Sequence, residues 1–97
     1  MKIWVDDVRP APEGWEHIHS VNEAIGAIVL EYENIDVISL DHDAGDYGPP
    51  DYIKILDWVE EVYGSDFKPA IKLHSANPVG IQNMRRIIEK NGWKEIH

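Results

Sequence analysis

Residues 35–43 read IDVISLDHD, and this segment indicates the class of fold most clearly. Residues 35–40 form an apolar run rich in β-branched side chains, which predicts a buried strand. The run ends abruptly in the polar residues 41–43. In parallel α/β sheets, ligands bind beyond the carboxyl ends of the strands, so this junction is the first candidate for a site.

The same pattern recurs on both sides of that stretch. Residues 2–5 form a short apolar strand that runs into Asp6 and Asp7, and residues 70–73 form another that runs into HSAN at 74–77. Weaker signals predict two more strands, at residues 15–19 and 93–96. Three polar clusters therefore follow three predicted strands, and we expect them to meet at one edge of the sheet.

Between the strands, three segments carry apolar residues at helical spacing. They are residues 21–32, the segment between Asp51 and Gly64, and the segment from Pro78 to Gly92. The residues expected to cap their N-termini are Ser20, Asp51 and Asn77. A loop containing Gly45, Gly48, Pro49 and Pro50 is expected before the second helix.

Strand and helix alternation predicts a three-layer α/β/α sandwich around a doubly wound, mainly parallel five-stranded sheet. Residues 1–97 are expected to form one domain. The first crossover is unusual, because only seven residues separate Asp7 from Trp15 and two of them are prolines. A helical crossover takes a dozen residues or more, so the first helix is expected to be missing or reduced to a turn.

Charge and composition restrict the classes of function. The chain has 18 acidic and 9 basic residues and a net charge of −9, which argues against binding to duplex DNA. A small phosphate ligand stays compatible with this charge, because a bound cation reverses it locally. There are no cysteines, no membrane-spanning run and no signal-peptide pattern, so a cytoplasmic location is expected.

Four carboxylates, Asp6, Asp7, Asp41 and Asp43, are expected to lie close together. At short range they repel one another unless protons or a cation intervene. Oxygen ligands with open positions suit Mg²⁺, and Mn²⁺ accepts the same donors. The simpler interpretation is that these aspartates only cap loops and helices.

His42 and His74 stand within the polar clusters and are candidates for general acid and base roles. Their alternative role is to support the loops by hydrogen bonding. Other residues are candidates for holding phosphate oxygens, with the helix start after Asn77 beside them. They are Arg9, Ser75 and Asn77. For Arg9 the alternative is a salt bridge within the acidic loop, and for Asn77 an ordinary helix cap.

The remaining histidines, His17, His19 and His97, lack such neighbours in the sequence and are interpreted as surface or edge residues. The four tryptophans are interpreted as mainly structural, since each lies in or beside a predicted element.

The order of these signals resembles the receiver domains of two-component signalling. Receivers carry an acidic pair after the first strand, a phosphoacceptor aspartate after the third, and Ser or Thr after the fourth. Asp6 and Asp7, Asp41, and Ser75 stand at those places. The chain departs from receivers because it has no lysine after a fifth strand and no final helix.

Three motifs resemble a receiver-derived family, the cyclic-phosphate-processing receiver domains. They are DDVRPAP at 6–12, LDHD at 40–43 and HSANPVG at 74–80. Ala44 replaces the commoner leucine after the second motif. The resemblance implies a flavodoxin-like or receiver-like fold with a reduced first helix. It also implies a phosphoesterase acting on cyclic phosphates of nucleotides or RNA ends.

Three hypotheses follow. The first is a metal-dependent phosphoesterase that uses Mg²⁺ or Mn²⁺ and takes a small phosphorylated ligand or an RNA 2′,3′-cyclic phosphate end. The second is a receiver-like signalling module phosphorylated at Asp41. The third is a module that binds a metal or nucleotide without chemistry. The sequence leaves the oligomeric state open.

Overall fold

The structure is a computed structural model and describes residues 1–43 and 51–97. Its five strands are β1 (Lys2–Val5), β2 (Trp15–Ile18), β3 (Val37–Leu40), β4 (Ala70–Leu73) and β5 (Glu95–Ile96). They form one sheet in the order β2-β1-β3-β4-β5, and every neighbouring pair is parallel. The predicted five-stranded parallel sheet and the receiver-like α/β fold are confirmed. The loop predicted around Gly45 to Pro50 lies outside the described residues.

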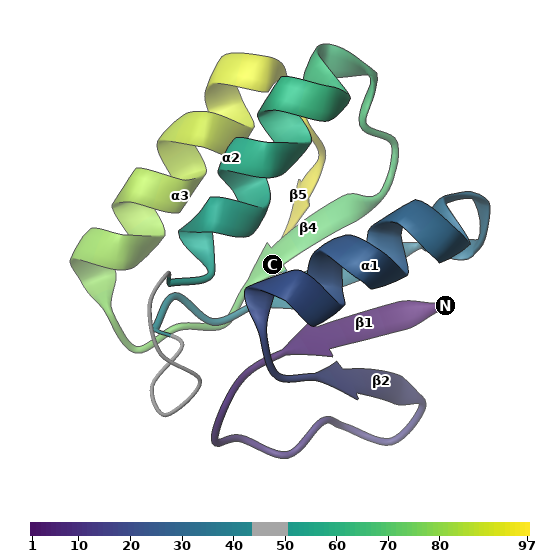
Figure 1. Cartoon of the computed structure of the whole chain (residues 1–97). Helices are drawn as coiled ribbons and strands as arrows, with labels where there is room; N and C mark the ends of the chain where they lie inside the picture. Colours follow the sequence, from purple (N-terminus) through teal and green to yellow (C-terminus); the bar gives the residue numbers. More distant parts are fainter. Residues whose placement is uncertain (44–50) are drawn as a thin grey trace.

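Three α-helices connect the strands: α1 (Val21–Glu31), α2 (Ile53–Val62) and α3 (Pro78–Asn91). Short 3₁₀ turns follow the first two, η1 (Tyr32–Asn34) and η3 (Gly64–Asp66). Figure 1 shows the three helices next to one another on one side of the sheet, with α2 between α1 and α3. No helix in residues 1–43 or 51–97 is long and apolar enough to cross a membrane.

The helices form one layer, and this refines the expected three-layer arrangement. From β2 to β5 the chain always moves in the same direction across the sheet, so right-handed crossovers place α1, α2 and α3 on the same face. The step from β1 to β2 goes the other way, and residues 6–14 make it without a helix, as predicted. The described residues therefore place no helix on the opposite face.

The helix caps follow the sequence at two of three places. Ser20 Oγ accepts from the Glu23 N–H, and Asn77 Oδ1 accepts from the Gly80 N–H. The prediction for Asp51 was wrong: the N-cap of α2 is Tyr52, whose side chain makes no cap hydrogen bond. Tyr52 is fully buried in the core. Its hydroxyl donates to the His19 carbonyl, so tertiary contacts, which a local capping preference does not include, hold the residue at the start of this helix.

The hydrophobic core fills the space between the sheet and the helices. Alternate strand residues face it, among them Ile3, Val5, Ile38, Leu40 and Ile71, each no more than 2% exposed. Because the strand ends are fixed by this packing, the polar residues that follow them are held at the same edge of the sheet.

Candidate functional site

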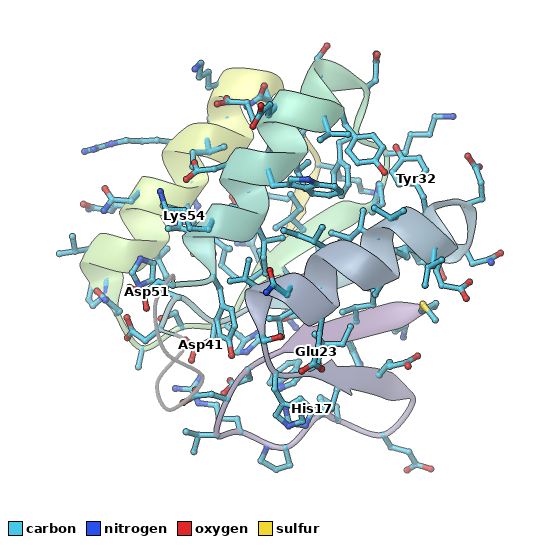
Figure 2. All side chains as sticks on the ribbon, in the orientation of Figure 1. His17, Glu23, Tyr32, Asp41, Asp51 and Lys54 are labelled. Atoms are coloured by element: carbon cyan, nitrogen blue, oxygen red, sulfur yellow. The ribbon has the colours of Figure 1, made fainter. Side chains whose placement is uncertain are left out.

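A polar cavity of about 360 Å³ lies at the carboxyl ends of β1, β3 and β4. Figure 2 labels Asp41, which lies just beyond the end of β3. The residues that line the cavity are Asp6, Asp7, Val8, Arg9, Asp41, Asp43, Ala76 and Asn77. Residues from all three predicted polar clusters therefore meet in one place.

Asp6 is the most firmly held member of the site, and its side chain is 1% exposed. Its Oδ1 accepts from the N–H groups of Val8 and Arg9, each at 2.9 Å, and its Oδ2 lies 2.9 Å from His74 Nε2. Burial raises the pKa of this carboxyl, but these hydrogen bonds outweigh burial and hold the pKa below its usual value. Asp6 is therefore an anion at neutral pH.

Three of the four predicted cation ligands come together. Asp6, Asp7 and Asp41 each offer a carboxylate oxygen, and these oxygens lie within 4.8 Å of one another. A carboxylate has about four lone-pair sites, and Asp6 uses three of them in hydrogen bonds, so one stays available. An all-oxygen set of anionic donors fits a hard divalent cation such as Mg²⁺ or Mn²⁺.

The fourth predicted ligand, Asp43, lines the same cavity but belongs to a different group. Its Oδ1 lies 2.8 Å from His42 Nδ1 and 3.4 Å from Asn77 Nδ2. His42, Asp43 and Asp51 form a second set of potential ligand atoms within 4.8 Å of one another. Because a carboxylate only accepts hydrogen bonds, His42 Nδ1 and Asn77 Nδ2 are the donors in these contacts.

His42 stands behind Asp43, packed against the first turn of α3. A Cβ built on Gly80 would lie 2.4 Å from His42 Cγ, so only glycine fits there without displacing the ring. The imidazole is 14% exposed and is not among the described residues that line the cavity. This packing fixes the ring in the position where it supports Asp43.

His74 lies beneath Asp6, and both of its ring nitrogens are engaged. Nε2 contacts Asp6 Oδ2, and Nδ1 lies 2.7 Å from Ser39 Oγ. Its ring stacks on Trp4, with centroids 3.7 Å apart and planes 6° from parallel. Burial lowers the pKa of His74, although Asp6 opposes this shift. Neutral His74 therefore donates a hydrogen bond from Nε2 to Asp6 and accepts one at Nδ1 from the Ser39 hydroxyl.

Ser39 is a residue of this network that the sequence analysis did not identify. Among the described residues, only Asp6 and Ser39 are buried polar or charged side chains, and both are 0% exposed. Both contact His74. A serine within an otherwise apolar buried strand was the available signal, because a buried hydroxyl needs a partner.

Two further aromatic residues hold the loop that follows β1. His17, labelled in Figure 2, lies on β2, and its Nε2 donates to the Asp6 carbonyl at 2.8 Å. The Trp4 indole N–H donates to the Arg9 carbonyl at 3.1 Å. His17 does lie on the edge strand β2, as interpreted, but its hydrogen bond to this loop was not predicted, and Trp4 contributes to the site. His19 stacks on His17, and His97 Nδ1 lies 3.8 Å from Glu95.

Two of the three predicted phosphate-binding residues line the cavity in the structure. Arg9 and Asn77 line the cavity, and the Arg9 guanidinium donates to the His74 carbonyl. Ser75 is not among the described lining residues, and its Oγ accepts from the Asn77 N–H at 3.0 Å. Ser75 thus shapes the turn that leads into α3.

The five-stranded parallel sheet with acidic residues after β1 and β3 defines a receiver-like α/β domain. A family model described as cyclic-phosphate processing receiver domain matches residues 1–90. The chain belongs to this family. Comparison with curated proteins and with solved structures gives no match.

Proposed function

We propose that the chain is a divalent-cation-dependent phosphoesterase acting on cyclic phosphates, with nucleotide or RNA 2′,3′-cyclic phosphate ends as substrates. One observation carries the proposal: three carboxylates within 4.8 Å of one another share a cavity with Arg9 and Asn77. The family match to residues 1–90 supports the same chemistry.

Asp6, Asp7 and Asp41 would hold the cation, which is Mg²⁺ or Mn²⁺. When bound, the ion supplies charge neutralisation and polarises a phosphoryl oxygen. Arg9 would fork onto the remaining phosphate oxygens, and the Asn77 amide would orient them from the start of α3. These two residues follow β1 and β4, the strands on either side of β3, so they would hold the phosphate from two separate loops.

His42 and His74 are each hydrogen-bonded to a carboxylate, to Asp43 and Asp6 respectively. We therefore propose roles for them that differ from direct acid and base catalysis by both. His74 is a positioning residue that keeps Asp6 in one orientation. The His42–Asp43 pair is the candidate for proton exchange, because Asp43 lines the cavity and its Oδ1 is hydrogen-bonded to His42. Asp43 would accept a proton from the attacking water as its oxygen bonds to phosphorus. One ring P–O bond would then break, and the leaving sugar oxygen would take the proton back from Asp43, with His42 holding Asp43 in place.

Steady-state hydrolysis of a 2′,3′-cyclic nucleotide tests these assignments. Asp41→Asn is expected to lower kcat/KM at least a hundredfold, since it removes a charged ligand. Asp57→Asn is the matched control, because Asp57 lies on α2 and pairs there with Lys54. Turnover of the Asp41→Asn protein equal to that of wild type would contradict the proposal, as would the absence of turnover with any of Mg²⁺, Mn²⁺ and Ca²⁺.

A signalling module is the second candidate, and the place of Asp41 directly after β3 favours it. In that case Asp41 would take a phosphoryl group from a small phosphodonor. Intact-mass measurement after exposure to such a donor separates the two. A stable mass gain in wild type that Asp41→Asn abolishes would support the signalling module. A cation-binding chain with neither mass gain nor turnover would be a binding module.

A further inference from the structure

The face of the sheet opposite the helices carries a distinct set of side chains. Strand residues alternate between faces, and residues paired in register share a face. The paired positions on this face, called the open face below, are Lys2, Trp4, Trp15, His17, Val37, Ser39, Ala70, Lys72 and Ile96. The other face carries the buried Ile3, Ile38 and Ile71 and packs against the helices.

Charge is divided between the two faces. The nine positions of the open face include two lysines and no acidic residue, although the chain has 18 acidic and 9 basic residues. The acidic residues within the described strands, Glu16 and Glu95, are in register with the helix-facing set. Val37, Ser39 and Ala70 are buried on this face, so all of its accessible positions except Ile96 are basic or aromatic.

The aromatic residues of the open face connect it to the site. Trp4 and Trp15 meet edge to face, with ring centroids 5.9 Å apart, and both are part-exposed. Lys2 Nζ lies 5.6 Å from the centre of the Trp15 ring. At the other end, Trp4 stacks on His74, which contacts Asp6. The segment between β1 and β2 meets this face at Trp4 and Trp15, through hydrogen bonds with Arg9 and Pro12.

We infer that the open face binds a single-stranded nucleic acid whose terminal phosphate occupies the cavity. This inference rests on the proposed function, which supplies the terminal phosphate. Single-strand binding combines basic groups for the backbone with aromatic rings for the bases. The open face has both, and its charge is opposite to that of the ligand. The net charge of −9 disfavours a duplex, which needs a broad basic surface.

The geometry also sets a length for the bound segment. A strand advances ~3.3 Å per residue, so the four residues of β1 separate the cavity from Trp15 by roughly 10–13 Å. Stacked nucleotides rise ~3.4 Å each, so about three or four of them span this distance. Near Lys2 and Trp15, at the far end of this distance, lies a hollow of about 350 Å³ that Met1, Gly14 and Glu16 also line.

The test measures kcat/KM for oligonucleotides of one to six residues that end in a 2′,3′-cyclic phosphate. We expect kcat/KM to rise about tenfold up to about four residues and then to level off. Lys72→Glu is expected to reduce the ratio of tetranucleotide to mononucleotide kcat/KM at least fivefold. Lys90→Glu is the control, because it makes the same change of charge on α3, which lies on the other side of the sheet. It is expected to leave this ratio unchanged. Lys72→Gln replaces Lys72→Glu if circular dichroism shows that the latter does not fold.

A second measurement is independent of hydrolysis. Fluorescence anisotropy follows a labelled single-stranded hexanucleotide without a cyclic phosphate, at increasing salt. We expect binding that weakens with salt and with Lys72→Glu. Binding without any turnover would refute the proposed function and keep the open face as a nucleic-acid surface. Turnover of a mononucleotide, with no effect of length and no binding of the hexanucleotide, would overturn the inference about the open face. It would leave the proposed function in place. A wild-type dimer that Lys72→Glu dissociates would also overturn the inference, because a second copy would then cover the open face.

Discussion

Among the individual residues, Ser39, His74 and Asp6 form a hydrogen-bonded series that ends at the proposed cation site. Asp6 and Ser39, the two buried polar residues among those described, stand at the two ends of this series. The neutral imidazole of His74 lies between them and is hydrogen-bonded to both side chains. Burial makes each unsatisfied group costly, so the network holds Asp6 in one orientation. The network thereby fixes the central carboxylate of the proposed cation site.

Ser39→Ala removes the donor to His74 Nδ1 and leaves a buried nitrogen without its partner. We expect this change to lower the free energy of unfolding by about 1–3 kcal/mol, measured by urea denaturation at pH 7. Ser65→Ala, at an exposed position in η3, is the control and should change it by less than about 0.5 kcal/mol. Equal effects of the two substitutions would show that the network contributes nothing to stability.

The pKa of His74 predicts how stability depends on pH. Burial lowers this pKa below its usual value of 6.5, so the unfolded chain binds a proton at a higher pH than the folded chain does. Stability is then fully present above about pH 6.5 and falls as the pH drops through the folded pKa. Urea denaturation from pH 8 to pH 5 measures this slope. His74→Gln keeps a donor for Asp6 and should flatten the slope, whereas an unchanged slope would assign it to other groups.

Part of the site could be predicted from sequence, because it follows a local pattern. An apolar strand that ends in aspartate identifies Asp6, Asp7 and Asp41 without knowledge of the fold. The partners of His74 could not be found in this way, since Ser39 and Asp6 are 35 and 68 residues away in the sequence. Whether an imidazole faces a cavity or supports a carboxylate depends on such distant contacts.

Among the secondary-structure elements, the N-terminus of α3 packs against the residues that follow β3. Gly80 and the His42 ring make this contact. The helix was predictable from Asn77 and Pro78, and both act as expected at its start. The close approach of Gly80 to the His42 ring was not predictable. A glycine in the first turn of a helix does not show from the sequence alone that another side chain packs against it. The start of α2 was also missed, because its N-cap residue, Tyr52, is buried in the core and makes no side-chain cap hydrogen bond.

Gly80→Ala tests this fit. The added Cβ would lie 2.4 Å from His42 Cγ, so the ring must move and its hydrogen bond with Asp43 must lengthen. We expect a loss of about 1–3 kcal/mol in unfolding free energy and at least a tenfold loss in kcat. Gly26→Ala is the matched control within α1, where nothing lies within 4 Å of the added Cβ. It should stabilise the chain by about 0.5–1 kcal/mol, and a similar gain from Gly80→Ala would refute the fit.

At the scale of the whole molecule, the direction of the crossovers decides what is covered and what is accessible. The three later connections run in one direction across the sheet, so the helices lie in one layer. The first connection has no helix, and the opposite face of the sheet carries Trp4, Trp15 and two lysines. The sequence indicated the missing first helix but led to an expected three-layer sandwich. The order of strands, which determines the layer of each helix, is not encoded in any single segment.

We propose that the carboxylates after β1 and β3 make this receiver-like domain a cation-dependent phosphoesterase. Phosphorus-31 NMR of a 2′,3′-cyclic nucleotide incubated with the purified chain and Mg²⁺ is the decisive measurement. We expect the cyclic phosphate resonance to be replaced by that of a phosphomonoester. We also expect a chelator or Asp41→Asn to stop the conversion. A cyclic phosphate signal that persists with Mg²⁺ and with Mn²⁺, or one that disappears equally fast with Asp41→Asn, would contradict the proposal.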